Sequence, residues 1–322
     1  MPAPFWLSFR VSLFIVNMRR MPILAALLLL LAGCSTLRTG AVNVIGNALA
    51  DGGGGVFNSD NDPELIEEAL PFGLKTFESL LANSPRHTGL LLAAANGFTS
   101  YAYLLQQRAD RLDEADLGAA EMLRHRASSL YLRGRDFALR GLETSHAGFT
   151  ENLKRDSGAA LAETRKSDIA FLYWAGASWA GALSADKDNA DLIADLPLAG
   201  AMMTRVLELD ETYDKGSAHE FFIAYESGRP GGNAEKAREH YARAMELSGG
   251  LRASVYLALA EGVDVRQQNL MEFRAMMASA LAVDPNRVPE TRLVNTIAHR
   301  RAEWLNTRIA DLFADAEEGA PR

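Results

Sequence analysis

The sequence predicts an all-helical protein built from repeated helix pairs. Three observations support this fold class. From Asp62 onward apolar residues recur at helical spacing, no segment alternates with the period of two that marks a strand, and several helices end in one short pattern. With 322 residues, of which 48% are apolar, the chain can bury a sizeable core.

The amino terminus has the order of a secretory signal. A short basic segment, residues 18–21, precedes the apolar run 22–31 and then small residues. The apolar run has about half of the roughly 20 residues that a helix needs to cross a bilayer. We therefore expect residues 1–33 to be a signal peptide, with Met18 as the true start.

Cys34 is the only cysteine, which excludes an intramolecular disulfide and a thiolate metal cluster. Leu31-Ala32-Gly33-Cys34 resembles the bacterial lipobox, in which the cysteine is acylated and becomes the first mature residue. The alternative is a membrane helix or an ordinary buried cysteine. Because Ser35 rather than Asp follows, the resemblance favours the inner leaflet of the outer membrane. We expect a periplasmic, lipid-anchored protein.

The segment after Cys34 predicts a tether. Residues 34–61 lack apolar periodicity and include four consecutive glycines, 52–55. A phosphate loop is the alternative, but no Gly-Lys-Ser/Thr follows these glycines. The formal net charge of -8 makes nucleic acid a poor partner.

Residues 62–316 are predicted to form the helical domain, and 317–322 a tail. Asp62 can cap the first helix, Pro63 suits its first turn, and Glu64 favours its dipole. The expected helices are 63–70, 72–82, 87–108, 114–133, 135–145, 158–164, 168–185, 190–208, 216–226, 233–248, 252–261, 269–283 and 291–315.

One pattern at the helix ends indicates a tetratricopeptide-like bundle or superhelix. Ala237, Tyr241, Ala244 and Gly249 match the second half of such a unit, which needs small, aromatic, small and breaking residues. Weaker copies occupy 73–85, 199–211 and 273–285. Pro71 and Pro197 precede two of the copies and should break or kink their helices. The pattern predicts two related halves, with a helical block inserted around 114–165.

Several short segments resemble, in their order along the chain, the T component associated with TRAP transporters, the TatT family of tetratricopeptide lipoproteins. They include Phe57, Asp60, 62–65, 69–72, 91–95, Gly97, Phe98, Tyr101, Ala102, 130–133, 172–174, 207–210, 219–221, 237–241, Phe273 and 300–304. The resemblance implies a periplasmic lipoprotein that docks a TRAP-type solute-binding protein. It also implies a homotrimer with a pore-like channel for apolar or organic-acid ligands.

No motif for catalysis, metal or cofactor binding is found. None of the six histidines forms a His-Glu-x-x-His pair, and no Gly-x-Ser-x-Gly elbow occurs. We predict a binding protein without enzymatic activity and without a cofactor. A tetratricopeptide lipoprotein of outer-membrane assembly is the alternative. A helical-toroid hydrolase also stays open, because two of the 41 acidic residues could converge in space.

Two aromatic features are candidates for a ligand channel. Tyr173, Trp174 and Trp179 lie among alanines and glycines, which let helices pack closely around large rings. Core packing is the alternative for all three. Arg301 and Trp304 are three residues apart and share a helix face, so they could bind an anion beside an aromatic ring, or only pack against each other.

Overall fold

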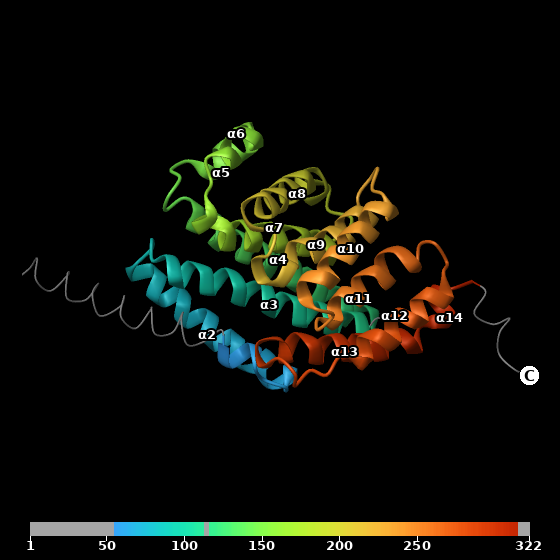
Figure 1. Cartoon of the computed structure of the whole chain (residues 1–322). Helices are drawn as coiled ribbons and strands as arrows, with labels where there is room; N and C mark the ends of the chain where they lie inside the picture. The colour runs from blue at the N-terminus through green and yellow to red at the C-terminus, as the bar shows by residue number, and fades with distance from the viewer. Residues whose placement is uncertain (1–54, 113–115, 315–322) are drawn as a thin grey trace, which may run out of the picture.

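The computed structural model describes residues 55–112 and 116–314 (Figure 1). The signal peptide, Cys34, most of the linker and the tail lie outside these residues. The described chain contains helices and no strands, which confirms the all-α prediction; the tetratricopeptide type of repeat stays a prediction. The α-helices are α2 (Pro63–Asn83), α3 (Thr88–Leu112), α4 (Leu117–Leu142), α5 (Phe149–Arg155), α6 (Ser157–Ala162), α7 (Ile169–Ala185), α8 (Ala190–Asp210), α9 (Ser217–Gly228), α10 (Ala234–Ser248), α11 (Ala253–Leu259), α12 (Leu270–Ala282), α13 (Arg292–Thr307) and α14 (Ile309–Leu312).

Four short helical segments connect these helices: η1 (Lys166–Asp168), η2 (Tyr213–Gly216), η3 (Ala260–Asp264) and η4 (Pro289–Thr291). Three are 3-10 turns, whereas η3 is a π-turn that extends α11. Its wider winding shows in the bond from Val265 N to Ala260 O, 3.0 Å long and five residues apart. π-turns inside helices frequently mark functional sites.

Helix boundaries differ from the predictions where the sequence carries a proline or glycine. The predicted break at Pro71 is wrong, because α2 continues through it. Buried Leu70 and Leu74 hold both sides of the proline against the core, so packing outweighs the lost hydrogen bond. The two helices predicted on either side of Gly134 form one helix, α4. The missed helix α5 has only seven residues, too few for a periodic signal.

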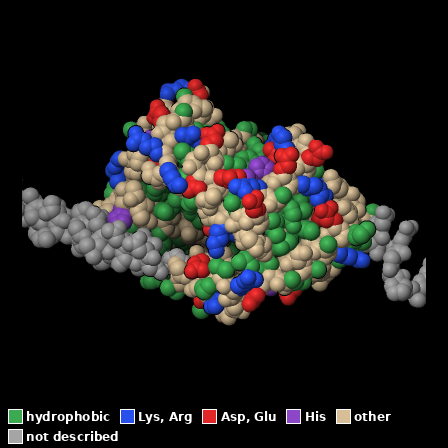
Figure 2. Space-filling view, in the orientation of Figure 1, with side chains coloured by type: hydrophobic (Ala, Val, Ile, Leu, Met, Phe, Trp, Pro, Cys, Tyr) green, Lys and Arg blue, Asp and Glu red, His purple; other side chains and the backbone are tan. Residues whose placement is uncertain are grey.

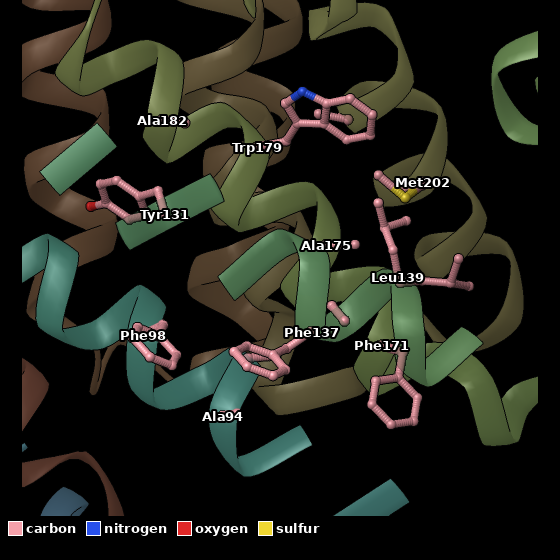
Figure 3. Close-up of a cluster of buried hydrophobic side chains, with 14 of the residues drawn as sticks. Ala94, Phe98, Tyr131, Phe137, Leu139, Phe171, Ala175, Trp179, Ala182 and Met202 are labelled. Carbon is pink, nitrogen blue, oxygen red and sulfur yellow. The ribbon is translucent and has the colours of Figure 1, made fainter. Parts of the chain in front are cut away.

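The largest buried cluster unites α2, α3, α4, α7 and α8, and Figure 3 shows part of it. Phe98 and Phe137 stack with ring centroids 5.5 Å apart. Gly141 of α4 is required here, because a Cβ at this position would overlap the ring of Phe171 from α7. Close helix approach therefore depends on small residues, as the composition around α7 indicates.

Two smaller clusters form the rest of the core. One lies among α11, α12 and α13 and includes Phe273, Leu305 and Phe313. The other joins α9, α10 and α11 through Ile223, Ala237 and Val255, among other residues. The carboxyl-terminal helices thus have a core of their own, beside the larger one.

The first and last long helices of the described chain lie side by side. Figure 1 shows α13 next to α2, and Arg300 of α13 forms an ion pair with Glu64 of α2. Arg292 Nη1 also donates to the carbonyl of Ser59 at 3.0 Å. The last long helix therefore returns to the first one. This arrangement also brings Arg301 of α13 to Asp110 of α3.

Candidate functional site

Helix α7 presents the predicted aromatic residues to two different environments. Trp179 is 2% exposed and packs in the largest core cluster, with the Arg135 guanidinium 4.8 Å from its ring centroid. Tyr173 and Trp174 are only partly buried. Their rings meet edge to face at 5.2 Å, and Tyr213 lies 5.5 Å from Tyr173. The three candidates on this helix are thus not equivalent.

Arg301 reaches from α13 into the space between α3 and η3. Its Nη1 donates to Asp110 Oδ2 at 2.7 Å, and its Nη2 donates to Glu261 Oε2 at 2.6 Å. The Trp304 ring centroid is 4.4 Å from the guanidinium carbon. Although burial opposes its charge, Glu261 and Asp110 raise the pKa of Arg301. The predicted pair of Arg301 and Trp304 is present, and the arginine is already held by two carboxylates.

A second arginine, Arg252, forms a similar group that sequence reasoning missed. It is 8% exposed. One Nη atom lies 3.0 Å from Asp214 Oδ2, and the other lies 3.5 Å from Glu220 Oε2. Asp214 and Lys215 adopt positive φ angles of 42° and 55°, which non-glycine residues rarely do. This strained turn in η2 brings the Asp214 carboxylate to Arg252.

Tyr103 of α3 and Tyr173 of α7 connect the two groups. Burial raises the pKa of Tyr103 to about 12, and Glu261, Glu220 and Asp110 act in the same direction. Burial also raises the pKa of Tyr173, with Asp214 and then Glu220 adding to the effect. The Glu220 carboxylate therefore acts on the pKa of both phenols, and it also lies 3.5 Å from Arg252.

We call this site the interior row: Asp110, Glu261, Arg301, Tyr103, Glu220, Arg252, Asp214 and Tyr173. Burial dominates the pKa of both tyrosines, yet both side chains keep part of their exposed surface. The row thus combines aromatic surface with a few fixed polar groups, which is the composition of a ligand site.

The sequence could not have revealed most of this row. Tyr103, Glu220, Arg252 and Glu261 come from four elements, and no spacing along the chain connects them. Trp304 packs against the carboxyl-terminal core cluster, whereas Tyr173 and Trp174 pack against the largest one. One usable signal was the short segment 219–221, which contains Glu220 and carries part of the family resemblance.

A separate polar cluster links the end of α8 to α9 and α10. His219 Nδ1 lies 2.8 Å from His240 Nδ1, and His219 Nε2 lies 3.2 Å from Glu211 Oε1. Arg243 donates to both Glu211 oxygens, at 2.7 and 2.8 Å. The ring of Phe222 stacks on His240 at 4.9 Å. Within the described residues, no three His, Cys, Asp or Glu side chains are arranged to bind a metal.

This histidine pair predicts a loss of stability on acidification. Burial lowers the pKa of both His219 and His240 below 6.5. Glu211 opposes this shift at His219 and Arg243 adds to it, whereas at His240 Glu226 and Glu239 oppose it and Lys236 adds to it. The unfolded chain therefore binds more protons than the folded one as the pH falls below 6.5. Stability is complete above that pH and declines toward the lower folded pKa values.

Thermal melting between pH 7.5 and 5 checks this expectation. Replacing both histidines by glutamine should reduce the decline, and the difference between the two proteins removes the contribution of carboxylates shared by both. Equal slopes for the two proteins would contradict the assignment.

In the described part of the chain, none of the helices combines the length and the apolar character needed to span a bilayer. The exposed face in Figure 2 carries basic and acidic side chains next to one another, with apolar areas between them.

Comparison with known proteins shows where this helical domain belongs. The family model of the TRAP transporter T-component matches residues 59–313, which include the helices from α2 to α14 and the whole interior row. The chain belongs to this family. It is also similar to an uncharacterised protein of Treponema pallidum (strain Nichols), with 28% identity over 268 residues, which cover 81% of this chain and 83% of that protein.

Membership confirms the family predicted from the sequence. T-components are accessory to TRAP transporters, and the family is not known for an enzymatic activity. Membership points to a periplasmic or membrane-associated location. Lipid attachment, the trimer, the solute-binding partner and the ligand are finer questions, and they are taken up below.

Proposed function

We propose that the chain is the lipid-anchored periplasmic scaffold of a TRAP-type transporter. It docks the solute-binding protein and passes an apolar or organic-acid ligand along the interior row, beside Tyr173, Trp174, Arg301 and Trp304. The observation that carries the proposal is a partly exposed row of aromatic and charged side chains inside a domain of the T-component family. Trp179, which is almost fully buried, contributes packing to this proposal and no ligand contact.

The proposal gives each part of the chain a task. A lipid on Cys34 holds the protein at the inner leaflet of the outer membrane, and the segment up to residue 61 lets the domain extend into the periplasm. Tethering raises the local concentration of a partner without a catalytic step. The arrangement needs no cofactor, and nucleic acid has no part in it.

Lipid attachment has a direct test. Mass spectrometry of the mature protein should find an acylated Cys34 as the first residue. A Cys34→Ser variant should then leave the membrane fraction and keep its fold. A mature protein that begins elsewhere, or that carries no lipid, would contradict this part of the proposal.

Exposed apolar side chains on α2 and on α4 support a protein interface. Leu65 and Phe72 are seven residues apart on α2, and they are 53% and 81% exposed. Leu117 and Met122 on the first turns of α4 are similarly exposed. Large apolar side chains exposed in this way are typical of sites where proteins associate. A homotrimer and a docked solute-binding protein are both proposed to use such surfaces.

A charge placed on α2 should disrupt association. Phe72→Glu is expected to weaken binding of the genetically adjacent solute-binding protein, or trimer formation, by at least about tenfold, which is about 1.4 kcal/mol. Met271→Glu on α12 is the matched control, because Met271 is 84% exposed on another helix. Analytical ultracentrifugation measures the oligomeric state, and titration calorimetry measures the affinity for the solute-binding protein. A wild-type protein that is monomeric and binds no such partner would refute the docking proposal.

The adjacent genes separate the two scaffold functions. A TRAP permease and a solute-binding protein beside this gene support the transport assignment, whereas neighbours that assemble outer-membrane proteins would favour the alternative. The hydrolase alternative would be supported if the purified protein turned over a substrate and lost this activity when a single carboxylate was mutated.

A further inference from the structure

Asp264, the last residue of the π-turn η3, carries a carboxyl group that is closed off from solvent. Its side chain is 0% exposed, and within the described residues its Oδ2 atom has no hydrogen-bond donor. Its Oδ1 atom lies 3.4 Å from Arg238 Nη2 of α10, which is long for a hydrogen bond between charged groups. A buried carboxylate with an unpaired oxygen is costly, and binding a proton removes this cost.

Arg238 does not neutralise Asp264, because Glu272 of α12 already holds this arginine. Arg238 Nη1 donates to Glu272 Oε1 at 2.5 Å, and Nη2 donates to Oε2 at 2.8 Å. Asn269 Nδ2 also donates to Oε2 at 2.8 Å, and the Glu272 amide donates back to Asn269 Oδ1 at 3.2 Å. These bonds fix the Glu272 carboxylate at the start of α12. One guanidinium thus serves two carboxylates, and its paired hydrogen bonds go to Glu272.

The carboxyl groups of Asp264 and Glu272 are neighbours in space. Arg238 Nη2 contacts both, at 3.4 Å and 2.8 Å, and α11, which leads into η3, packs against both α10 and α12 (Figure 1). Two ionised carboxylates around one positive charge repel each other, and a proton between them removes the repulsion. A proton on Asp264 also gives its buried oxygen a bond to make, since the oxygens of Glu272 are acceptors.

The surroundings of Asp264 favour the protonated form. Burial, followed by the charge of Glu272 and a hydrogen bond with it, raises the pKa of Asp264 to about 7, against the opposing effect of Arg238. Among the described residues, Arg238 is the only cation within ion-pair distance of Asp264. The packed elements otherwise contribute phenols, groups paired elsewhere and exposed arginines: Tyr241, Tyr256, Glu226 with Arg229, Glu261 with Arg301, Arg266 and Arg274.

We propose that Asp264 and Glu272 form a proton-binding site, in which Asp264 holds a proton up to about neutral pH and donates it to Glu272. The bound proton joins η3 to α12, beside Arg238 of α10. Above neutral pH Asp264 releases the proton to solvent, the two carboxylates repel each other, and the junction of η3, α10 and α12 becomes weaker. The packing of the carboxyl-terminal helices therefore responds to pH.

Infrared spectroscopy of the full-length protein tests for the proton directly, because a protonated carboxyl group absorbs separately from an ionised one. The wild-type protein at pH 6 should show the band of a protonated carboxyl group that disappears by pH 8. Asp264→Asn should lack this band at both pH values. Glu303→Gln, which removes an exposed carboxylate from α13, is the control and should keep it.

Glu272→Gln tests whether the proton depends on the neighbouring carboxylate. In this variant Arg238 has Asp264 as its remaining carboxylate partner, so Asp264 should keep its charge at a lower pH. The affinity of Asp264 for the proton should fall at least about tenfold, which moves the disappearance of the band by about one pH unit or more.

The melting temperature gives a second reading, with a sign opposite to that of the histidine pair. Folded Asp264 binds its proton more tightly than the unfolded chain does, so its contribution to stability is lost as the pH rises from about 4 to about 7. Asp264→Asn keeps the size of the side chain and supplies an amide donor, without a titration. The wild type should therefore lose stability relative to this variant between pH 5 and 7. Both proteins contain the histidines, whose effect cancels in the difference.

Each outcome decides one part of the proposal. Absence of the wild-type band at pH 6, or its persistence in Asp264→Asn, overturns the site. A band that is unchanged at pH 8 overturns proton release, and a titration unmoved in Glu272→Gln overturns the pairing with Glu272. If Asp264→Asn does not fold, the wild-type band and its shift in Glu272→Gln still decide the assignment.

Discussion

Replacing Trp179 by alanine is expected to lower the free energy of unfolding by about 3–5 kcal/mol. The indole is 2% exposed and lies in the cluster that joins α3, α4, α7 and α8. Its removal would leave a cavity that the closely packed glycines and alanines around it cannot fill. Urea unfolding followed by circular dichroism measures the change.

Trp174→Ala on the same helix is the matched control for this prediction. Trp174 is only partly buried, so its removal should cost less, about 1–2 kcal/mol, and the variant should stay folded. If Trp174 lines the passage, this variant should also lose binding of an apolar ligand. Equal losses of stability in Trp174→Ala and Trp179→Ala would contradict the assignment of packing to Trp179 and of ligand contact to Trp174. A large loss at Trp174 without a separate binding defect would leave only a packing role for it.

Replacing Arg301 by alanine should be comparably destabilising, at about 3–5 kcal/mol. The side chain is 14% exposed and is shared by Asp110 and Glu261, so its removal takes this partner from Glu261 and leaves Asp110 with its longer, 3.5 Å contact to Arg124. A denaturant titration at pH 7.5 measures the change.

A double variant shows whether unpaired charge causes this loss. Glu261→Gln combined with Arg301→Ala should recover part of the stability, because one of the stranded charges is gone. Arg308→Ala tests a surface pair near the end of the same helix, where Asp311 is 54% exposed, and should cost about 0–1 kcal/mol. No recovery in the double variant would mean that Arg301 stabilises the fold through its contact with Trp304 instead.

The sequence was sufficient for the fold class, because amphipathic periodicity is a local property of each helix. It failed where tertiary packing outweighed a local preference. Pro71 should end a helix, but buried Leu70 and Leu74 hold α2 together across it. Gly134 lies inside α4, where a Cβ would meet Thr99 and the backbone of α3, so the glycine serves helix contact rather than helix termination.

The candidate site was predictable only in part. The cluster of rings on α7 is visible in the sequence, yet the difference between partly exposed Trp174 and buried Trp179 depends on which helices cover each side. The sequence singles out Arg301 beside Trp304, but it does not show which carboxylates pair with this arginine. Asp110 and Glu261 are distant in the sequence, and only the closed arrangement of helices brings them to the same guanidinium.

The contacts that the π-turn η3 makes with two arginines depend on the number of residues in this turn. Within five residues it directs Glu261 to Arg301 on α13 and Asp264 to Arg238 on α10. Deleting one residue would restore ordinary winding and rotate everything beyond it by about 100° about the helix axis. The contacts Glu261–Arg301 and Asp264–Arg238 could not then both form. The loop at 229–233, whose residues are mostly exposed, has no such restriction, so changes of chain length should accumulate there and be excluded from 260–264.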